Sequence, residues 1–285
     1  ARKWITERVD SILVNERIDH YRGDFNISPL GFWRGNDADD RQGITESFYV
    51  RGFLAFWDEL LRRHPNMYID TCASGGRRND LETLRRSVPL LRSDWAVAHF
   101  DKPGAIGQQC QTYGISLWIP YHGTGTVACA GAPYYGGGLT PVEPYAFWSN
   151  AAPSLGCGVD IRVKEIDYAA LRRLYNQWRQ ISAYYYGDFY PLTRYDRGND
   201  VWMAWQFDCP DLGQGVVQVF RRPDSPYEAA RFRLRGLDAD ARYTVTDLDA
   251  NEPKEMSGRE LLDPGLPVAA PQRPAARVIT YRRLP

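Results

Sequence analysis

The strongest constraint on the fold is the alternation of short apolar runs with helical segments over residues 1–187. The apolar runs that resemble strands are 18–26, 67–71, 87–94 and 115–123. Apolar residues recur at helical spacing in 44–63, 80–87 and 166–183. Strands that alternate with helices predict a parallel sheet, in either a barrel or a doubly wound fold.

The pattern changes after residue 188, where short apolar segments are separated by turn residues and helical periodicity is weak. These segments are "DVWMAWQFD", "GVVQVFRR", "ARFRLRG", "ARYTVTD" and "ARVITYRR". Such spacing is typical of a small antiparallel β-sandwich. The sequence therefore predicts two domains, a strand–helix domain over 1–187 and a β-sandwich over 188–285.

The composition argues against several classes of partner. Lys plus Arg equals Asp plus Glu, 35 each, whereas nucleic-acid binding requires an excess of basic charge. No apolar run is long enough to span a membrane. The five cysteines contain no C-x-x-C pair, and the four histidines show no metal-ligand spacing. The glycine-rich segment 122–138 matches no phosphate or dinucleotide motif, so we expect a flexible loop there.

Polar side chains gather where three of the predicted strands end. The three groups are Arg22, Asp24 and Asn26; Cys72 to Arg77; and Ser93, Asp94 and Trp95. In a parallel barrel, successive strand ends converge on one pocket. Two of these ends carry a carboxylate, Asp24 and Asp94, and paired carboxylates are the apparatus of glycoside hydrolysis.

Each of these residues also has a structural interpretation. An aspartate after a strand commonly forms a turn or caps a helix. Asp70 and Asp80 are competing carboxylates, although Asp80 suits a helix cap and Asp70 lies within its strand. Cys72 on its own suits a small core position. Gly75 and Gly76 have no β-carbon, so their backbone can approach a ligand closely.

The same residues carry a resemblance to a known family. "YRGDFN", "DTCASGGRRNDLETLRRS" and "LLRSDW" resemble, in order, the K-W-D-x-N, C-x-x-G-G-x-R-x-D and S-D motifs of family-36 glycoside hydrolases, the melibiase-type α-galactosidases. The resemblance extends over most of the chain. It implies an α/β fold, a partial (β/α)8 TIM barrel with about strands 4–8, followed by the antiparallel β-sandwich.

The resemblance implies a role for each matching residue. Asp24 would be the nucleophile and Asp94 the general acid/base of a retaining mechanism that needs no metal and no organic cofactor. Asp80 would brace the loop together with Arg77, and Cys72 with the two glycines would define the space around the sugar C2 substituent. The residues implied in substrate binding are Arg22, Asn26, Cys72, Gly75, Gly76, Arg77 and Trp95.

Two positions depart from the family pattern. Arg22 stands in place of a lysine and is larger and forked. Gly23 stands in place of a tryptophan, which removes an apolar wall. The expected activity is hydrolysis of terminal α-D-galactosides. The alternatives are a related α-glycosidase such as an α-N-acetylgalactosaminidase, for which Cys72 leaves little room, or a non-catalytic carbohydrate-binding remnant.

The resemblance also implies that the chain is a C-terminal portion of a longer enzyme. The N-terminal β domain and the first three barrel strands have no counterpart, so we expect weak or no activity from these residues alone. The expected partner is a small carbohydrate, without nucleic acid or membrane, and a homo-oligomer of the full-length protein is left open. The preferred sugar and aglycone are also left open, and free cysteines favour the cytoplasm.

Overall fold

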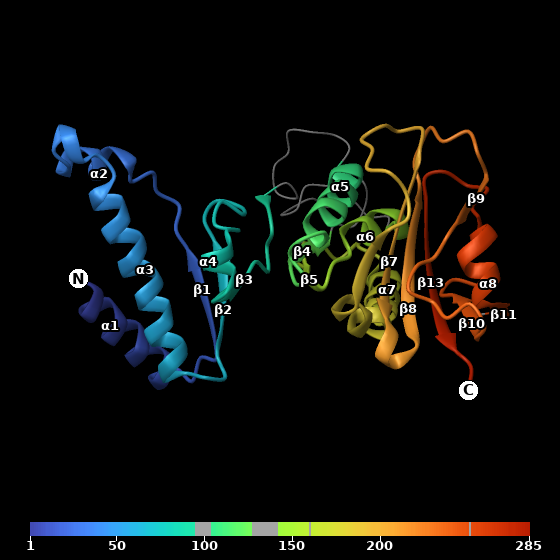
Figure 1. The fold of residues 1–285 in the computed structure, drawn as a ribbon, viewed down its shortest axis with the longest axis horizontal. Coiled ribbons are helices and arrows are strands. Elements are labelled where there is room, and N and C mark those ends of the chain that lie inside the picture. The colour runs from blue at the N-terminus through green and yellow to red at the C-terminus, as the bar shows by residue number, and fades with distance from the viewer. Residues whose placement is uncertain (95–103, 127–141, 160, 251) are drawn as a thin grey trace. The chain divides into compact units, whose positions relative to one another are not determined.

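The computed structural model describes residues 1–94, 104–126, 142–159, 161–250 and 252–285, and the chain divides into two units, Ala1–Asp94 and Trp95–Pro285 (Figure 1). The first unit holds a parallel three-stranded sheet in the order β1-β2-β3. Its elements are α1 (Arg2–Asn15), β1 (His20–Asp24), α2 (Leu30–Asn36), η1 (Asp39–Arg41), α3 (Ile44–Arg63), β2 (Tyr68–Cys72), α4 (Leu81–Leu84) and β3 (Ser87–Val88).

Helix α3 connects β1 to β2 and has the bounds that the sequence predicts. The helix ends at Arg63, just before His64 and Pro65, because the residue before a proline avoids helical geometry. Trp57 and Leu60 of its apolar stripe are fully buried in a core cluster with Ile69 of β2. A strand–helix–strand connection of this kind makes β1 and β2 parallel, so their carboxyl ends lie at one edge of the sheet.

The second unit begins with helices and a short parallel strand pair. The elements are α5 (Gly104–Ser116), β4 (Gly123–Thr126), α6 (Pro144–Asn150), β5 (Ser154–Cys157), α7 (Tyr168–Ile181) and η3 (Ser182–Tyr186), with β4 parallel to β5. Helix α7 is the helix that the sequence predicts over 166–183. It begins where the side chain of Asp167 accepts a hydrogen bond from the Ala170 N–H at 2.9 Å.

The rest of the second unit is antiparallel, as the sequence predicts. A six-stranded sheet has the order β11-β10-β13-β8-β7-β6, and a two-stranded sheet pairs β12 with β9. The bounds are β6 (Asp188–Pro191), β7 (Trp202–Cys209), η4 (Pro210–Leu212), β8 (Gln214–Arg221), β9 (Ala229–Phe232), β10 (Arg242–Asp247), β11 (Pro253–Ser257), α8 (Gly258–Glu260), η5 (Leu261–Gly265), β12 (Leu266–Ala269) and β13 (Ala275–Arg283).

Both faces of the six-stranded sheet are buried at its strands β7 and β8. Met203, Trp205 and Phe207 of β7 pack into a core cluster that includes residues of α5, α6 and α7. The intervening Ala204 packs into a second cluster with residues of β9 and β12. Figure 1 shows these helices on one side of the sheet and β9 and α8 on the other. Because successive side chains point to opposite faces, burial of both faces explains why β7 and β8 are apolar almost throughout.

One predicted element is wrong and two are much shorter than predicted, one of which is the helix predicted over 80–87, now α4 (Leu81–Leu84). The run 115–123 was expected to be a strand, but α5 continues to Ser116 and β4 begins only at Gly123. Short apolar runs do not distinguish a strand from a helix end, and Leu117 and Trp118 in this run are exposed. Of the run 87–94, only Ser87 and Val88 form a strand.

Within the parts of the chain that the structure describes, no helix combines the length and the apolar character needed to cross a membrane.

Candidate active site

The carboxyl ends of β1 and β2 bring several predicted site residues together. Asp24 lies beside Cys72 in the parallel register, and Arg22 lies beside Asp70. Since side chains alternate along a strand, these four side chains share one face of the sheet. The side chains of Arg22 and Asp24 are 38% and 36% exposed, so both are accessible from solvent.

Arg22 contacts two carboxylates at this face. Its Nη1 donates a hydrogen bond to Oδ2 of Asp70, and its Nη2 lies 3.6 Å from Oδ2 of Asp24. Burial alone would lower the pKa of Arg22, but the hydrogen bond to Asp70 and the neighbouring negative charges raise that pKa overall. The Arg22 guanidinium is therefore held positive between a buried carboxylate and an accessible one.

Asp70, which the sequence suggests only as a competing carboxylate within its strand, belongs to this cluster of side chains. It is 2% exposed, and its Oδ1 accepts a hydrogen bond from the Leu90 N–H at 2.9 Å. It thereby joins β1, through Arg22, to the segment after β3. No local sequence signal marks this partnership, because it follows from the register in which pairing Asp24 with Cys72 also pairs Arg22 with Asp70.

The loop after β2 is built from three consecutive residues in the left-handed region. Ser74, Gly75 and Gly76 have φ of 52°, 73° and 79°. Asn26 holds the start of this loop, because its Oδ1 accepts hydrogen bonds from the Ser74 N–H at 2.7 Å and the Ser74 hydroxyl at 2.8 Å. Asn26 therefore ties the end of β1 to the end of β2.

The two glycines allow this loop to pack tightly against the segment that contains Asp94. A β-carbon on Gly75 would lie 2.5 Å from the backbone nitrogen of Asp94 and 2.7 Å from its Cγ. A β-carbon on Gly76 would lie 2.4 Å from the carbonyl oxygen of Arg92. Distances this short are repulsive, so only glycine fits at either position. The loop after β2 thus lies next to both Asp24, through Asn26, and Asp94.

Cys72 presents a neutral thiol to this cluster. Its side chain is 3% exposed, and burial raises the pKa of the thiol. The Asp24 carboxylate raises the pKa further, whereas the Gly75 N–H and Arg22 oppose the shift. A protonated, buried thiol next to Asp24 is a small steric wall rather than a nucleophile.

The two arginines of the loop have different environments. Arg77, the predicted brace, is exposed, whereas Arg78 is half-buried. The Arg78 guanidinium lies 4.9 Å from the ring centre of Phe25 and 4.7 Å from that of Phe53. The motif C-x-x-G-G-x-R-x-D places its arginine at 78, which is the signal that the sequence reasoning missed. Asp80 caps α4 by accepting from the Thr83 N–H at 3.0 Å.

The departure at Gly23 lies on the other face of β1. A β-carbon on Gly23 would lie 3.1 Å from the ring of Trp57 in α3. This position therefore faces the helix, on the opposite side of the strand from Arg22 and Asp24. Position 23 packs β1 against α3, so the glycine there does not remove a wall from the face that bears Arg22 and Asp24.

Two further expectations concern positions outside this cluster. Trp95, a predicted substrate-binding residue, lies outside the residues that the structure describes. Within those residues, no group of three or more His, Cys, Asp or Glu side chains is arranged to hold a metal ion.

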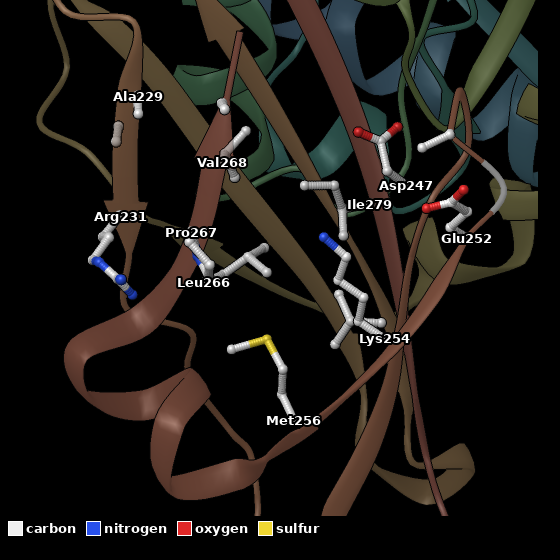
Figure 2. Close-up of a pocket in the computed structure, with 14 residues that line it drawn as sticks. Ala229, Arg231, Asp247, Glu252, Lys254, Met256, Leu266, Pro267, Val268 and Ile279 are labelled. Atoms are coloured by element: carbon white, nitrogen blue, oxygen red, sulfur yellow. The ribbon is translucent and has the colours of Figure 1, made fainter.

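The antiparallel region over residues 188–285, called the β domain below, contains a groove that holds none of the predicted site residues (Figure 2). It has a volume of about 710 Å³ and lies between β9–β12 and β10–β11. Leu266, Val268 and Ile279 form part of its wall, and Glu252 and Lys254 bring charge to it. None of the fourteen residues drawn in Figure 2 is aromatic, so this groove offers no ring on which a sugar could stack.

Comparison with known proteins identifies relatives over nearly the whole chain. Residues 202–280 match the glycosyl hydrolase family 36 C-terminal domain. The chain is 24% identical to alpha-galactosidase AgaA of Geobacillus stearothermophilus, over 95% of this chain and 35% of that protein. It is also 24% identical to alpha-galactosidase Mel36A of Lactobacillus acidophilus, over 93% of this chain and 35% of that protein. The chain thus spans about a third of the length of these curated relatives.

Solved structures give the same result for the fold. A variant of AgaA in complex with raffinose aligns with a TM-score of 0.77 and 20% identity, covering 99% of this chain and 38% of that chain. A variant in complex with stachyose aligns with a TM-score of 0.78 and 22% identity, with the same coverage. The resemblance inferred from the sequence motifs is confirmed: the chain is similar to family-36 alpha-galactosidases over nearly its whole length, and residues 202–280 match the C-terminal domain of that family.

Proposed function

We propose that the complete gene product that contains this chain is a retaining α-galactosidase. The single observation that carries the proposal is the packing of the Gly75 loop between the end of β1, which bears Asp24, and the segment that bears Asp94. A scaffold that brings two carboxylates to the same edge of a parallel sheet, on either side of the loop after β2, suits glycoside hydrolysis. The relatives named as alpha-galactosidases support the choice of reaction.

The proposed architecture is the C-terminal part of a (β/α)8 barrel over residues 1–187, followed by a β-sandwich over 188–285. The parallel order of β1, β2 and β3 and the parallel pair β4–β5 support the barrel. In a barrel enzyme the carboxyl ends of the strands carry the catalytic groups, and Asp24 and Cys72 occupy the last positions of β1 and β2.

In the proposed mechanism, Asp24 attacks the anomeric carbon and Asp94 protonates the departing glycosidic oxygen. The product of this step is a covalent galactosyl–enzyme ester. Asp94 then takes a proton from water, which attacks the same carbon and releases Asp24 as a carboxylate, so the configuration is retained. Arg22, Asn26, Arg77 and Trp95 are proposed to contact the sugar.

The proposed substrates are small oligosaccharides with a terminal α-galactosyl group. AgaA variants have been solved with raffinose and with stachyose, which supports this class of sugar. The Cys72 thiol and the backbone of Gly75 and Gly76 are proposed to lie around the sugar C2 substituent. A buried cysteine next to a tightly packed loop favours a hydroxyl there over a bulkier acetamido group.

The test is hydrolysis of 4-nitrophenyl α-galactoside and of raffinose by the complete gene product. Asp24→Ala should lower activity by several orders of magnitude on both substrates, because the nucleophile is absent. Asp94→Ala should lose much less activity on the nitrophenyl substrate than on raffinose, since nitrophenolate departs without a proton. Added azide should restore turnover to Asp24→Ala and yield the inverted glycosyl azide.

Different outcomes would reject different parts of the proposal. Undiminished activity in Asp24→Ala would reject Asp24 as the nucleophile. Hydrolysis of the N-acetylgalactosaminide in preference to the galactoside would reject galactose as the sugar. Sugar binding by a wild-type protein that hydrolyses none of these substrates would favour a carbohydrate-binding protein instead.

A further inference from the structure

We propose that Asp70 is a positioning residue that keeps the Arg22 guanidinium from closing onto Asp24, and so leaves Asp24 free to attack the sugar. This inference rests on the proposed function, in which Asp24 is the nucleophile. It concerns a carboxylate that does not itself touch the substrate. Asp70 would act through Arg22, which lies between the two acidic side chains.

The geometry shows an unequal division of one guanidinium between two carboxylates. Nη1 of Arg22 donates a hydrogen bond to Asp70, whereas Nη2 lies 3.6 Å from Oδ2 of Asp24. Hydrogen bonds between nitrogen and oxygen have lengths of about 2.7–3.2 Å, so the contact with Asp24 is an ion pair without a hydrogen bond. Arg22 is thus attached to Asp70 and only adjacent to Asp24.

Asp70 is suited to hold Arg22 because it is buried and has a second hydrogen-bond partner. The Asp70 side chain is 3% exposed, against 36% for Asp24. Its second oxygen accepts a hydrogen bond from the Leu90 N–H at 2.9 Å. A buried carboxylate requires a positive partner, which makes Asp70 the stronger competitor for the guanidinium.

The consequence for catalysis follows from the shape of arginine. A guanidinium presents two parallel N–H donors that match the two oxygens of a carboxylate. If Asp70 loses its charge, Arg22 is free to form such a two-point pair with Asp24 in the resting enzyme. That pair must weaken before Asp24 can attack, because two N–H donors withdraw charge from both carboxylate oxygens and make them poorer nucleophiles. The arginine at position 22 therefore requires a second carboxylate.

The first variant is Asp70→Asn, made in the complete gene product. Asparagine has nearly the same shape and keeps an oxygen for the Leu90 N–H, but it does not attract the guanidinium. We expect kcat for 4-nitrophenyl α-galactoside to fall about 10- to 100-fold, the worth of a charge-assisted hydrogen bond gained only in the ground state. KM should change less than about 3-fold, because the sugar contacts other than that of Arg22 remain.

The second variant separates positioning from a general loss of structure. Lysine at position 22 cannot form the two-point pair. Arg22→Lys alone should lower activity, because the sugar contacts of the guanidinium are lost. The same substitution in the Asp70→Asn background should raise kcat above that of Asp70→Asn. A merely structural role for Asp70 predicts that the two losses add.

Two further variants test the proposal if Asp70→Asn does not fold. Arg22→Gln removes the guanidinium, and Arg22→Gln with Asp70→Asn removes both charges and leaves no buried ion unpaired. Without a guanidinium to restrain, Asp70 has no effect on Asp24, so these two variants should have the same kcat. Asp208→Asn, a change at an equally buried carboxylate in the β domain, is the matched control and should leave kcat unchanged.

The outcomes separate this inference from the proposed function. Active wild type, inactive Asp24→Ala and an unchanged kcat in Asp70→Asn would overturn the role of Asp70 alone. So would additive losses in the double variant, or unequal kcat in the Arg22→Gln pair. A wild-type protein that hydrolyses no α-glycoside would overturn the proposed function, and this inference with it.

Discussion

Two clusters of polar side chains in this protein each contain an aspartate, but one cluster is accessible to solvent and the other is buried. At the end of β1, Asp24 and Arg22 are more than a third exposed, and their charges meet at 3.6 Å. In the β domain, Asp208 is 2% exposed and accepts a hydrogen bond from the Tyr281 hydroxyl. That hydroxyl in turn accepts from Gln206 Nε2 at 2.8 Å, and Gln206 Oε1 accepts from the Arg235 N–H at 2.8 Å.

The two clusters differ in the partners of their hydrogen-bonding groups. In the β domain, the side chains bond to one another and are shielded from water, so the network contributes rigidity. At the end of β1, accessible lone pairs and N–H groups remain available to a ligand. Polar residues of the same types thus serve packing in one region and chemistry in the other, and exposure at a strand end distinguishes the two.

The largest expected effect comes from two matched glycines. Gly75 and Gly236 have φ of 73° and 74°, and each lies against an aspartate. Gly75→Ala would place its β-carbon 2.5 Å from the backbone of Asp94, so the proposed acid must move. A displacement of about 1 Å can cost roughly 100-fold in rate, and we expect a fall in kcat of that size.

Gly236→Ala is the control for this prediction. Its β-carbon would lie 2.7 Å from Oδ2 of Asp208, so it strains the β domain instead. We expect a lower melting temperature with kcat retained in the folded enzyme. Equal kcat losses in the two variants, measured on raffinose, would remove the distinction between the clusters.

The next largest effect concerns the stability of the buried hydrogen-bond network of Asp208, Tyr281 and Gln206. Tyr281→Phe leaves the buried Asp208 carboxylate and Gln206 without a shared partner. Leaving a buried polar group unsatisfied costs about 1–3 kcal/mol, and more for a charged one. Hydrogen exchange at the amides of β7, β8 and β13 should become faster, while kcat stays within about 2-fold. Unchanged exchange would show that the network contributes little.

A smaller effect is the pH dependence of the same cluster. Burial raises the pKa of Asp208 above its usual 3.8, and the charge of Asp188 adds to the shift against the Tyr281 hydrogen bond. The folded state therefore binds the proton more tightly than the unfolded state. The stabilisation is fully present below pH 3.8 and is lost as the pH rises through the raised pKa.

The measurement is a comparison of wild type with Asp208→Asn. The difference in unfolding free energy between them should favour the wild type more as the pH falls from 7 towards 4. Asparagine does not titrate, so other carboxylates cancel in the difference. A difference that stays constant over this range would contradict the assignment.

The smallest effect distinguishes the two arginines of the loop after β2. Arg78→Met removes the contacts with the rings of Phe25 and Phe53, which are worth about 0.5–2 kcal/mol. We expect KM to rise several-fold, because the loop is less firmly held. Arg77→Met removes an exposed side chain that is proposed to contact the sugar, so it should raise KM without loosening the loop. Equal losses of protection from hydrogen exchange in the loop of the two variants would contradict this distinction.

Local sequence signals were sufficient for the elements that carry the cluster. The apolar stripe and Pro65 gave both ends of α3, and the apolar run 67–71 marked β2, which spans Tyr68–Cys72. The motifs located Asp24, Cys72 and the two glycines. Whether these residues perform the proposed chemistry is a separate question, which the experiments above address.

Other features depend on contacts between distant residues and could not be predicted locally. The partnership of Arg22 with Asp70 depends on strand register, and the direction of Gly23 depends on Trp57. The short strand β11 has few apolar residues of its own and forms by pairing with the longer strand β10. The prediction of a strand over 115–123 was wrong because the apolar residues of this run lie around the end of helix α5.

The shared core beneath the six-stranded sheet also limits how this region can change during evolution. Trp205 and Phe207 of the sheet pack in one cluster with Leu171 and Leu174 of α7 and Phe147 of α6. The segment that matches the family-36 C-terminal domain begins only at residue 202. Transferred alone to another gene, it would expose one whole face of its sheet. We therefore expect it to be inherited together with the preceding helices and not exchanged as an independent cassette.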